Sequence, residues 1–144
     1  MKRFSFSPVA KVVFTALIVT AFASSAFARQ SEKRINASIE GYTQAIESGA
    51  TQLTETAIYN VIRFNRKYPT ADYTNVLEAL NRTSIEGENE QIRFKAHLAV
   101  TVMKNNELLT GVEFYEFEDQ QQFYNAVARK MLARNIAALQ DKMD

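Results

Sequence analysis

A single histidine and the absence of cysteine narrow the catalytic chemistry open to this chain of 144 residues. A Ser-His-Asp arrangement would have to use His97 with Ser31, Ser38, Ser48 or Ser84, and none of these serines lies in a nucleophile-elbow context. His97 occupies a helical position beside an apolar face, where a packed or half-exposed histidine is expected. A general base needs an oriented partner and a pocket. We therefore predict that the protein is not an enzyme.

The sequence also lacks the usual signatures of metal and cofactor sites. It contains no Cys-x-x-Cys or His-x-x-x-His pair of the kind that binds zinc. Glu86, Glu88 and Glu90 alternate around Gly87, but they lack the Asp/Asn-rich loop of an EF-hand, so a solvated acidic loop is expected. No glycine-rich loop of the P-loop or dinucleotide type is present. We predict no cofactor.

The N-terminal segment has the pattern of a cleavable signal peptide. Lys2 and Arg3 precede the mostly apolar run 12–23, and Ala-Phe-Ala at 26–28 gives the small-x-small pattern of a cleavage site. A permanent membrane anchor is the alternative, but a spanning helix needs about 20 apolar residues. Without cysteine, a lipid-anchored form is excluded. We expect residues 1–28 to be removed on export to the periplasm or the medium.

The mature chain, residues 29–144, is then expected to form one domain of balanced charge. The signal segment holds three of the 17 basic residues and none of the 16 acidic ones, so 14 basic residues remain against 16 acidic and the net charge is −2. Nucleic-acid binding normally requires a basic excess. The same balance argues against electrostatic docking on anionic lipid. We expect a protein partner, no nucleic acid and no stable membrane anchor.

Helical periodicity and the scarcity of helix breakers predict an all-α domain. Pro69 and four glycines are the only breakers after the signal segment. Apolar residues recur at intervals of three and four residues over five segments. The predicted helices span residues 32–48, 51–68, 72–81, 89–105 and 119–142, separated by a loop at 83–88 and an irregular, aromatic connector at 107–118 that docks on the core.

Several residues are suited to begin or end these helices. Gly49 is placed to end the first helix in a left-handed conformation. Thr51, Asp72 and Asn89 are predicted N-caps of the next three helices, and Asp119 is predicted to open the last one.

The apolar residues predict which faces point inward. On the second helix the inward face is expected to start at Leu53 and to include Val61. On the last helix the inward stripe is expected to comprise Phe123, Val127, Leu132, Ile136 and Leu139.

Two helices match each other at a shift of 39 residues. The matching pairs are Leu53 and Ile92, Ala57 and Ala96, Val61 and Val100, and Phe64 and Met103. Over residues 51–105 the sequence resembles HEAT-like helical repeats, and this resemblance implies stacked helical hairpins that bind macromolecules. The alternative is a small irregular five-helix bundle. The whole chain also resembles small exported bacterial helical proteins of unassigned function.

Two surface features are candidate interface elements. One is the basic end of the second helix, with Arg63, Arg66 and Lys67, which also suits the helix dipole. The other is the connector, where Phe114, Tyr115 and Phe117 stand among acidic residues, a composition typical of interface anchors. The alternative for these aromatic residues is that they fold onto the core.

These observations predict a non-enzymatic exported helical module that serves in protein–protein interaction or as a scaffold. The alternative is a periplasmic envelope-stress or chaperone-like helical protein. Proteins of that kind carry Leu-Thr-x-x-Gln repeats, which the segment 53–57 (Leu-Thr-Glu-Thr-Ala) resembles only without the glutamine.

Overall fold

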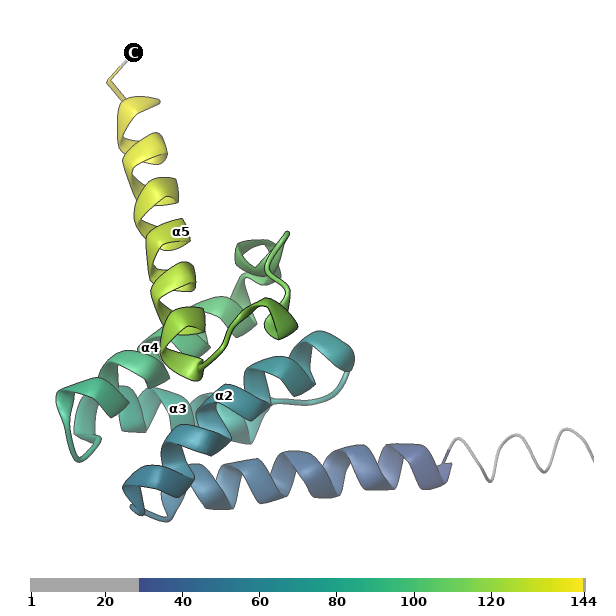
Figure 1. The fold of residues 1–144 in the computed structure, drawn as a ribbon. Helices are drawn as coiled ribbons and strands as arrows, with labels where there is room; N and C mark the ends of the chain where they lie inside the picture. The colour runs from purple at the N-terminus through teal and green to yellow at the C-terminus, as the bar shows by residue number, and fades with distance from the viewer. Residues whose placement is uncertain (1–28, 144) are drawn as a thin grey trace, which may run out of the picture. The chain divides into compact units, whose positions relative to one another are not determined.

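The computed structural model describes residues 29–143, so the predicted signal peptide at residues 1–28 lies outside the described residues. Within the described range every regular element is helical and no strand occurs. The elements are an α-helix over residues 29–47, α2 (Thr51–Lys67), α3 (Thr74–Glu86), α4 (Glu90–Lys104), the 3₁₀ helices η1 (Asn106–Leu109) and η2 (Phe114–Glu116), and α5 (Gln120–Gln140) (Figure 1). The predicted all-α fold with five helices is confirmed.

The chain divides into two compact units, residues 1–37 and residues 38–144. The described part of the first unit is the N-terminal stretch of the first helix, residues 29–37, in which only Ile35 is half-buried. All the packing and the sites described below belong to the second unit, to which the first helix contributes residues 38–47.

The helix ends confirm three of the five predicted boundary residues. Gly49 has a positive φ of 70° two residues after the end of the first helix. The Asn89 side chain accepts a hydrogen bond from the Ile92 N–H at 2.9 Å, and Asp119 accepts one from the Gln122 N–H at 2.8 Å. Each of these side chains satisfies a backbone donor that has no partner within its own helix.

The other two predicted N-caps are wrong. α2 begins at Thr51 itself, with Ala50 as N-cap, and the Thr51 hydroxyl donates to the carboxylate of Glu88 instead. α3 has Tyr73 as its N-cap. Asp72 lies one residue earlier and accepts hydrogen bonds from the Thr74 hydroxyl at 2.6 Å and the Thr74 N–H at 2.9 Å. The bond from the Thr74 hydroxyl, and to a lesser extent the bond from the Thr74 N–H, hold the pKa of Asp72 below its usual value.

α3 is longer than predicted and runs through most of the expected loop at 83–88. It ends at Gly87, whose N–H donates to the Thr83 carbonyl at 2.9 Å. A Cβ at position 87 would lie 2.5 Å from that carbonyl oxygen, so only glycine fits this close turn into α4. The last turn of α3 carries no apolar face, which is why periodicity did not reveal it.

α4 is the central helix of the second unit, because it packs against both α2 and α3. The core side chains with 2% exposure or less include Ile58, Val61 and Ile62 of α2, Val76 and Leu80 of α3, and Ile92, Ala96, Leu98 and Ala99 of α4. The inward position predicted for Val61 is therefore confirmed.

Leu53 does not follow the predicted face. Its side chain is 50% exposed, whereas that of the matching Ile92 is 2% exposed. The inward position in this turn belongs to Thr54, which is 3% exposed and whose hydroxyl lies 3.4 Å from the carbonyl oxygen of Ile46 in the first helix. Successive residues of a helix are about 100° apart, so Leu53 faces solvent.

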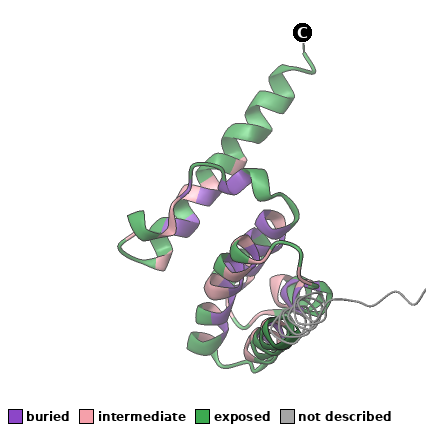
Figure 2. Cartoon of the chain, turned by 90° about the vertical axis from the view of Figure 1, so that its right-hand side faces the viewer, coloured by how far each residue is buried: buried purple, intermediate pink, exposed green. Residues whose placement is uncertain are grey.

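α5 is packed along only half of its length. Phe123, Tyr124 and Val127 are fully buried, but Leu132, Ile136 and Leu139 are 61%, 48% and 62% exposed, so the single predicted inward stripe is wrong after Val127. In Figure 2 the C-terminal half of α5 is exposed throughout and extends away from the other helices of the second unit.

Candidate functional site

The residues that sequence analysis considered for catalysis are not brought together. His97 is exposed on α4. The Ser48 hydroxyl donates to the Ala45 carbonyl at 2.8 Å, and the Ser84 hydroxyl to the Asn81 carbonyl at 2.7 Å, so both are engaged within their own segments. Among residues 29–143, no group of three or more histidine, cysteine, aspartate or glutamate side chains is placed to hold a metal ion.

A pocket of about 320 Å³ opens between the end of the first helix, α3 and the turn into α4. Glu47, Arg82, Glu86 and Glu88 are among its lining residues. Glu47 forms an ion pair with Arg82 at 3.1 Å, and the Glu88 carboxylate accepts a hydrogen bond from the Thr51 hydroxyl. Glu47 and Arg82 neutralise each other, all four side chains are exposed, and we assign no chemistry to the pocket.

The two candidate interface elements meet in one place, which we call the basic–aromatic corner (Arg63, Arg66 and Phe114). The guanidinium groups of Arg63 and Arg66 lie 5.8 Å and 5.6 Å from the centre of the Phe114 ring. Arg66 also donates to the Val112 carbonyl and pairs with Glu113 at 3.3 Å. Cation–π contacts and the ion pair therefore fasten the connector to the end of α2.

Lys67 does not take part in this corner, because its ammonium group lies 5.3 Å over the ring of the neighbouring Tyr68. Two basic residues of α4, Arg93 and Lys95, also lie outside this corner. Arg93 donates to the Gly87 carbonyl at 2.8 Å, and Lys95 is buried.

The three aromatic residues of the connector have different environments. Phe114 stacks on Phe123 of α5 with ring centres 5.0 Å apart, and Phe117 contacts the same ring edge-on at 5.7 Å. Both are half-buried, whereas Tyr115 is 83% exposed. Phe114 and Phe117 therefore anchor the connector on α5, and Tyr115 alone extends from it.

An ion pair between buried Lys95 and half-buried Glu55, which sequence analysis missed, lies between α2, α4 and α5. The Lys95 ammonium group is 3.2 Å from a carboxylate oxygen of Glu55 and 5.4 Å from the centre of the Tyr124 ring. Burial, followed by the nearby charge of Glu55, raises the pKa of Tyr124 above its usual value. The signal was the position of Lys95, which falls between Ala99 and Val102 on the buried face of α4.

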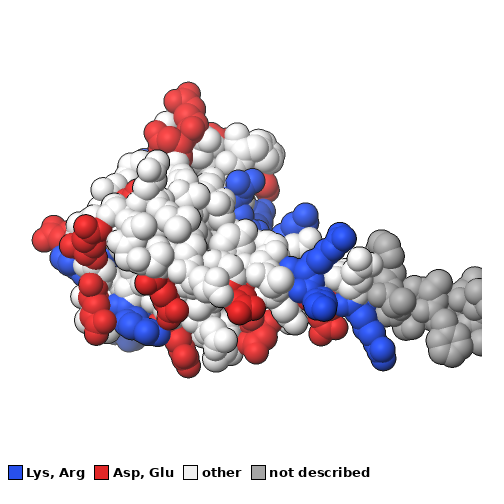
Figure 3. Space-filling view, turned by 90° about the horizontal axis from the view of Figure 1, so that it is seen from below, with Lys and Arg blue, Asp and Glu red and all other residues white. Residues whose placement is uncertain are grey.

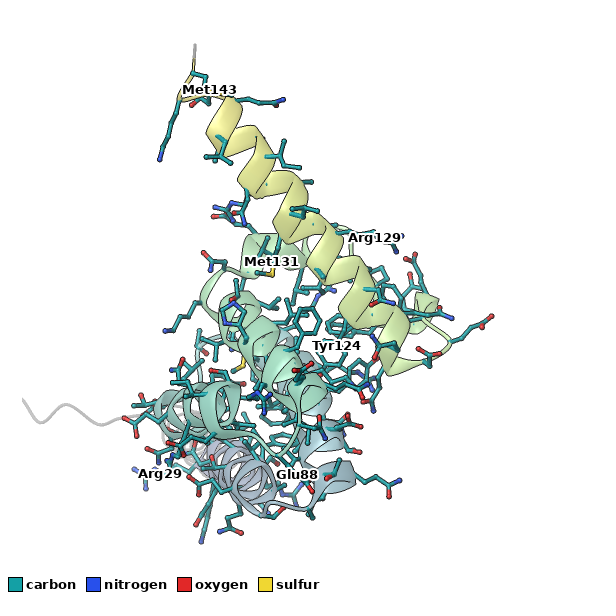
Figure 4. All side chains as sticks on the ribbon, turned by 90° about the vertical axis from the view of Figure 1, so that its left-hand side faces the viewer. Arg29, Glu88, Tyr124, Arg129, Met131 and Met143 are labelled. Carbon is teal, nitrogen blue, oxygen red and sulfur yellow. The ribbon has the colours of Figure 1, made fainter. Side chains whose placement is uncertain are left out.

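The second missed feature is an apolar row on the exposed half of α5, which we call the second face of α5 (Leu132, Ile136, Leu139 and Met143). Met143 lies in the turn that follows the helix and is 78% exposed. Figure 4 shows Tyr124 among the packed helices and Met143 at the far end of α5.

The second face arises from the spacing of the apolar residues. Val127 and Leu132 are five residues apart, and a five-residue step turns a helix by about 140° beyond one full turn. The positions that continue the packed face of α5 beyond Met131 are Arg134, Asn135 and Ala138. The apolar residues thus leave the packed side of the helix and form a new row on another side.

The chain was compared with models of protein families, with curated proteins and with solved structures, and no match was found in any of the three comparisons.

Proposed function

We propose that this chain is a non-enzymatic, exported helical module that binds another polypeptide through the second face of α5. The observation that carries the proposal is the row of Leu132, Ile136 and Leu139, whose side chains are 61%, 48% and 62% exposed on one side of the C-terminal half of α5. Export is inferred from the signal-like pattern of residues 1–28.

The row is unusual because its exposed apolar side chains all lie on one face of the helix. Single exposed apolar residues are common on protein surfaces, but several on one face indicate an interaction site. Full burial of a leucine or isoleucine side chain contributes about 1.5–3 kcal/mol. A partner that covers Leu132, Ile136 and Leu139 would recover that contribution without any change in the packed core, since none of the three takes part in the core.

Other features of the described residues favour a binding role over the remaining classes. His97 and the engaged hydroxyls of Ser48 and Ser84 offer no nucleophile with a base. On the face seen in Figure 3, acidic and basic side chains are interspersed with uncharged surface, and neither sign forms a continuous field of the kind that attracts nucleic acid. No helix within residues 29–143 has both the length and the apolar character needed to span a membrane.

The proposal can be tested by photo-crosslinking in the native envelope and medium fractions. A photoreactive amino acid at position 139 should give a saturable crosslink to a defined polypeptide. Ile136→Asp should abolish that crosslink, whereas the matched variant Ala137→Asp should retain it, because position 137 is exposed but lies about 100° from Ile136 around the axis.

Two results would contradict this function. Equal loss of the crosslink in both aspartate variants would show that the second face is not the contact surface. Suppression of the aggregation of many unrelated clients, without a saturable partner, would instead support the chaperone-like alternative.

A further inference from the structure

We propose that the polypeptide covering the second face of α5 is a second copy of this chain, with the two helices antiparallel. This inference rests on the proposed function and names its partner. It is carried by the spacing of the second face, by the residues that flank it, by the position of Arg129 and by the direction in which the face points.

The spacing is that of a coiled-coil seam. Leu132, Ile136, Leu139 and Met143 are separated by four, three and four residues, which is the alternation of a and d positions in a heptad. A helix with such a seam is complementary to a second helix of the same kind. A twofold pair would therefore use the same residues on both copies and would close without leaving a further face open.

The residues beside the seam allow two copies to approach. The flanking positions within α5 are occupied by Ala133, Asn135 and Gln140, none of which is charged, and the one charged residue beside the seam is Lys142 in the following turn. Like charges at these positions would repel and would select against pairing of identical helices. The uncharged flanks within α5 avoid that repulsion, and in an antiparallel pair Lys142 would lie opposite Asn135 of the other copy and not opposite another cation.

Arg129 determines the direction of the pair. It occupies the next seam position before Leu132 and lies at the opposite end of the exposed half from Met143 (Figure 4). In a parallel pair the two Arg129 side chains would face each other and repel. In an antiparallel pair each Arg129 lies beside the C-terminal end of the partner's α5, where the helix dipole is negative and favours a cation.

The seam also points away from the packed helices. The residues that dock α5, Phe123, Tyr124 and Val127, are fully buried on a different side of the helix. Their face and the seam are separated by about 140° around the axis, as the step from Val127 to Leu132 requires. A second copy can therefore reach the seam without displacing the core contacts.

Four seam residues on each copy make a small interface, so the expected dimer is reversible, with a dissociation constant in roughly the micromolar range. Sedimentation equilibrium of the protein recovered after export should show a monomer–dimer equilibrium over this range. Ile136→Asp should weaken dimerisation by at least about tenfold. Ala137→Asp should leave it unchanged, and both variants should keep the helical spectrum and melting temperature of the wild type.

The direction can be tested by disulfide formation, because the natural chain contains no cysteine. A mixture of Ala133→Cys and Gln140→Cys proteins, one of them carrying a tag, should form the mixed disulfide, since these flanking positions face each other only in the antiparallel pair. A mixture of Asn135→Cys and Gln140→Cys brings its cysteines together only in the parallel pair and should not form it. Preferential formation of the second disulfide would overturn the proposed direction.

Other outcomes would overturn self-pairing, and they would show separately whether the proposed binding function survives. A protein that stays monomeric, and whose photo-crosslink at position 139 joins it to a different polypeptide in an Ile136-dependent manner, would disprove self-pairing but keep the binding function. A monomer that binds anionic phospholipid vesicles through Ile136, with no polypeptide crosslink, would disprove both. A dimer that is equally stable in both aspartate variants would place the interface elsewhere.

Discussion

The two halves of α5 belong to one continuous helix but have opposite relations to the rest of the protein. In the first half Phe123, Tyr124 and Val127 are fully buried, whereas in the second half Leu132, Ile136 and Leu139 are largely exposed. Both halves contain large apolar residues at helical spacing. The difference shows that amphipathic spacing predicts a helix and a face, but the phase of that face determines whether the protein's own core can cover it.

The halves also differ in what keeps them helical. The first half is held by packing, which supplies most helix stability in proteins. The second half extends a helix that is already nucleated, and it contains Ala133, Ala137 and Ala138, which favour helix intrinsically. One ion pair, between Arg134 and Glu107 at 3.5 Å, links this half to η1. Just before the half begins, the Lys130 ammonium group donates to the carbonyl of Thr110, the residue that follows η1.

The largest expected contrast comes from placing the same aspartate in each half. Val127→Asp should lower the free energy of unfolding by about 4 kcal/mol or more, because it buries an unpaired carboxylate. Ile136→Asp should change it by less than about 0.5 kcal/mol. Chemical denaturation, under conditions in which the protein is monomeric, measures both, and similar losses in the two variants would show that the second half is also packed.

A second contrast removes side-chain volume rather than adding charge. Phe123→Ala should cost about 3–5 kcal/mol, because it leaves a cavity and removes the ring on which Phe114 and Phe117 rest. Leu139→Ala should stay within about 0.5 kcal/mol of the wild type. If Phe123→Ala were as mild as Leu139→Ala, the docking of the connector on α5 would be wrong.

A third prediction concerns the buried hydroxyl group of Tyr124 in the packed half of α5. Its hydroxyl is buried without a hydrogen-bond partner among the described residues, so Tyr124→Phe should be neutral or stabilise by up to about 1 kcal/mol at pH 7. Because burial raises the pKa of Tyr124 in the folded state, the wild type should lose stability as the pH rises above about 10, by up to about 1.4 kcal/mol per pH unit. Urea unfolding of both proteins at pH 7 and pH 10.5 should show a smaller loss for the variant.

The smallest effect is expected where the second half of α5 is linked to the packed part. Arg134 and Glu107 are both exposed, and such pairs contribute about 0–1 kcal/mol. Arg134→Ala should therefore lower the melting temperature by no more than about 5 °C. A drop as large as that of Phe123→Ala would mean that the ion pair, and not the buried aromatic ring, positions α5.

Much of the fold could be predicted because its signals are local. Gly49 marks the end of the first helix through its left-handed backbone, and Asn89 and Asp119 mark helix starts through bonds to backbone N–H groups three residues away. Thr51 and Asp72 also have polar side chains near a helix start, but neither is the N-cap. Thr51 bonds to Glu88 and Asp72 bonds to Thr74. The type of residue at a helix start predicts the start within a residue or two and leaves the partner open.

The candidate sites were less predictable, because they depend on long-range contacts. Arg63 and Arg66 lie about fifty residues from Phe114 in the chain, and no spacing rule links them. The second face of α5 was accessible in principle, since the five-residue step from Val127 to Leu132 is visible in the sequence. Reading Phe123 to Leu139 as one stripe overlooked that rotation.

The exposed half of α5 has a consequence for local opening. A helical segment of about a dozen residues with little packing is only marginally stable in water, so residues 132–143 should open with a free energy close to zero while α4 opens only with the whole domain. Amide hydrogens there should exchange with solvent well before those around Ala96, and proteases should cut there first. A partner that pairs with this segment would order it, so the gain in amide protection would report occupancy directly.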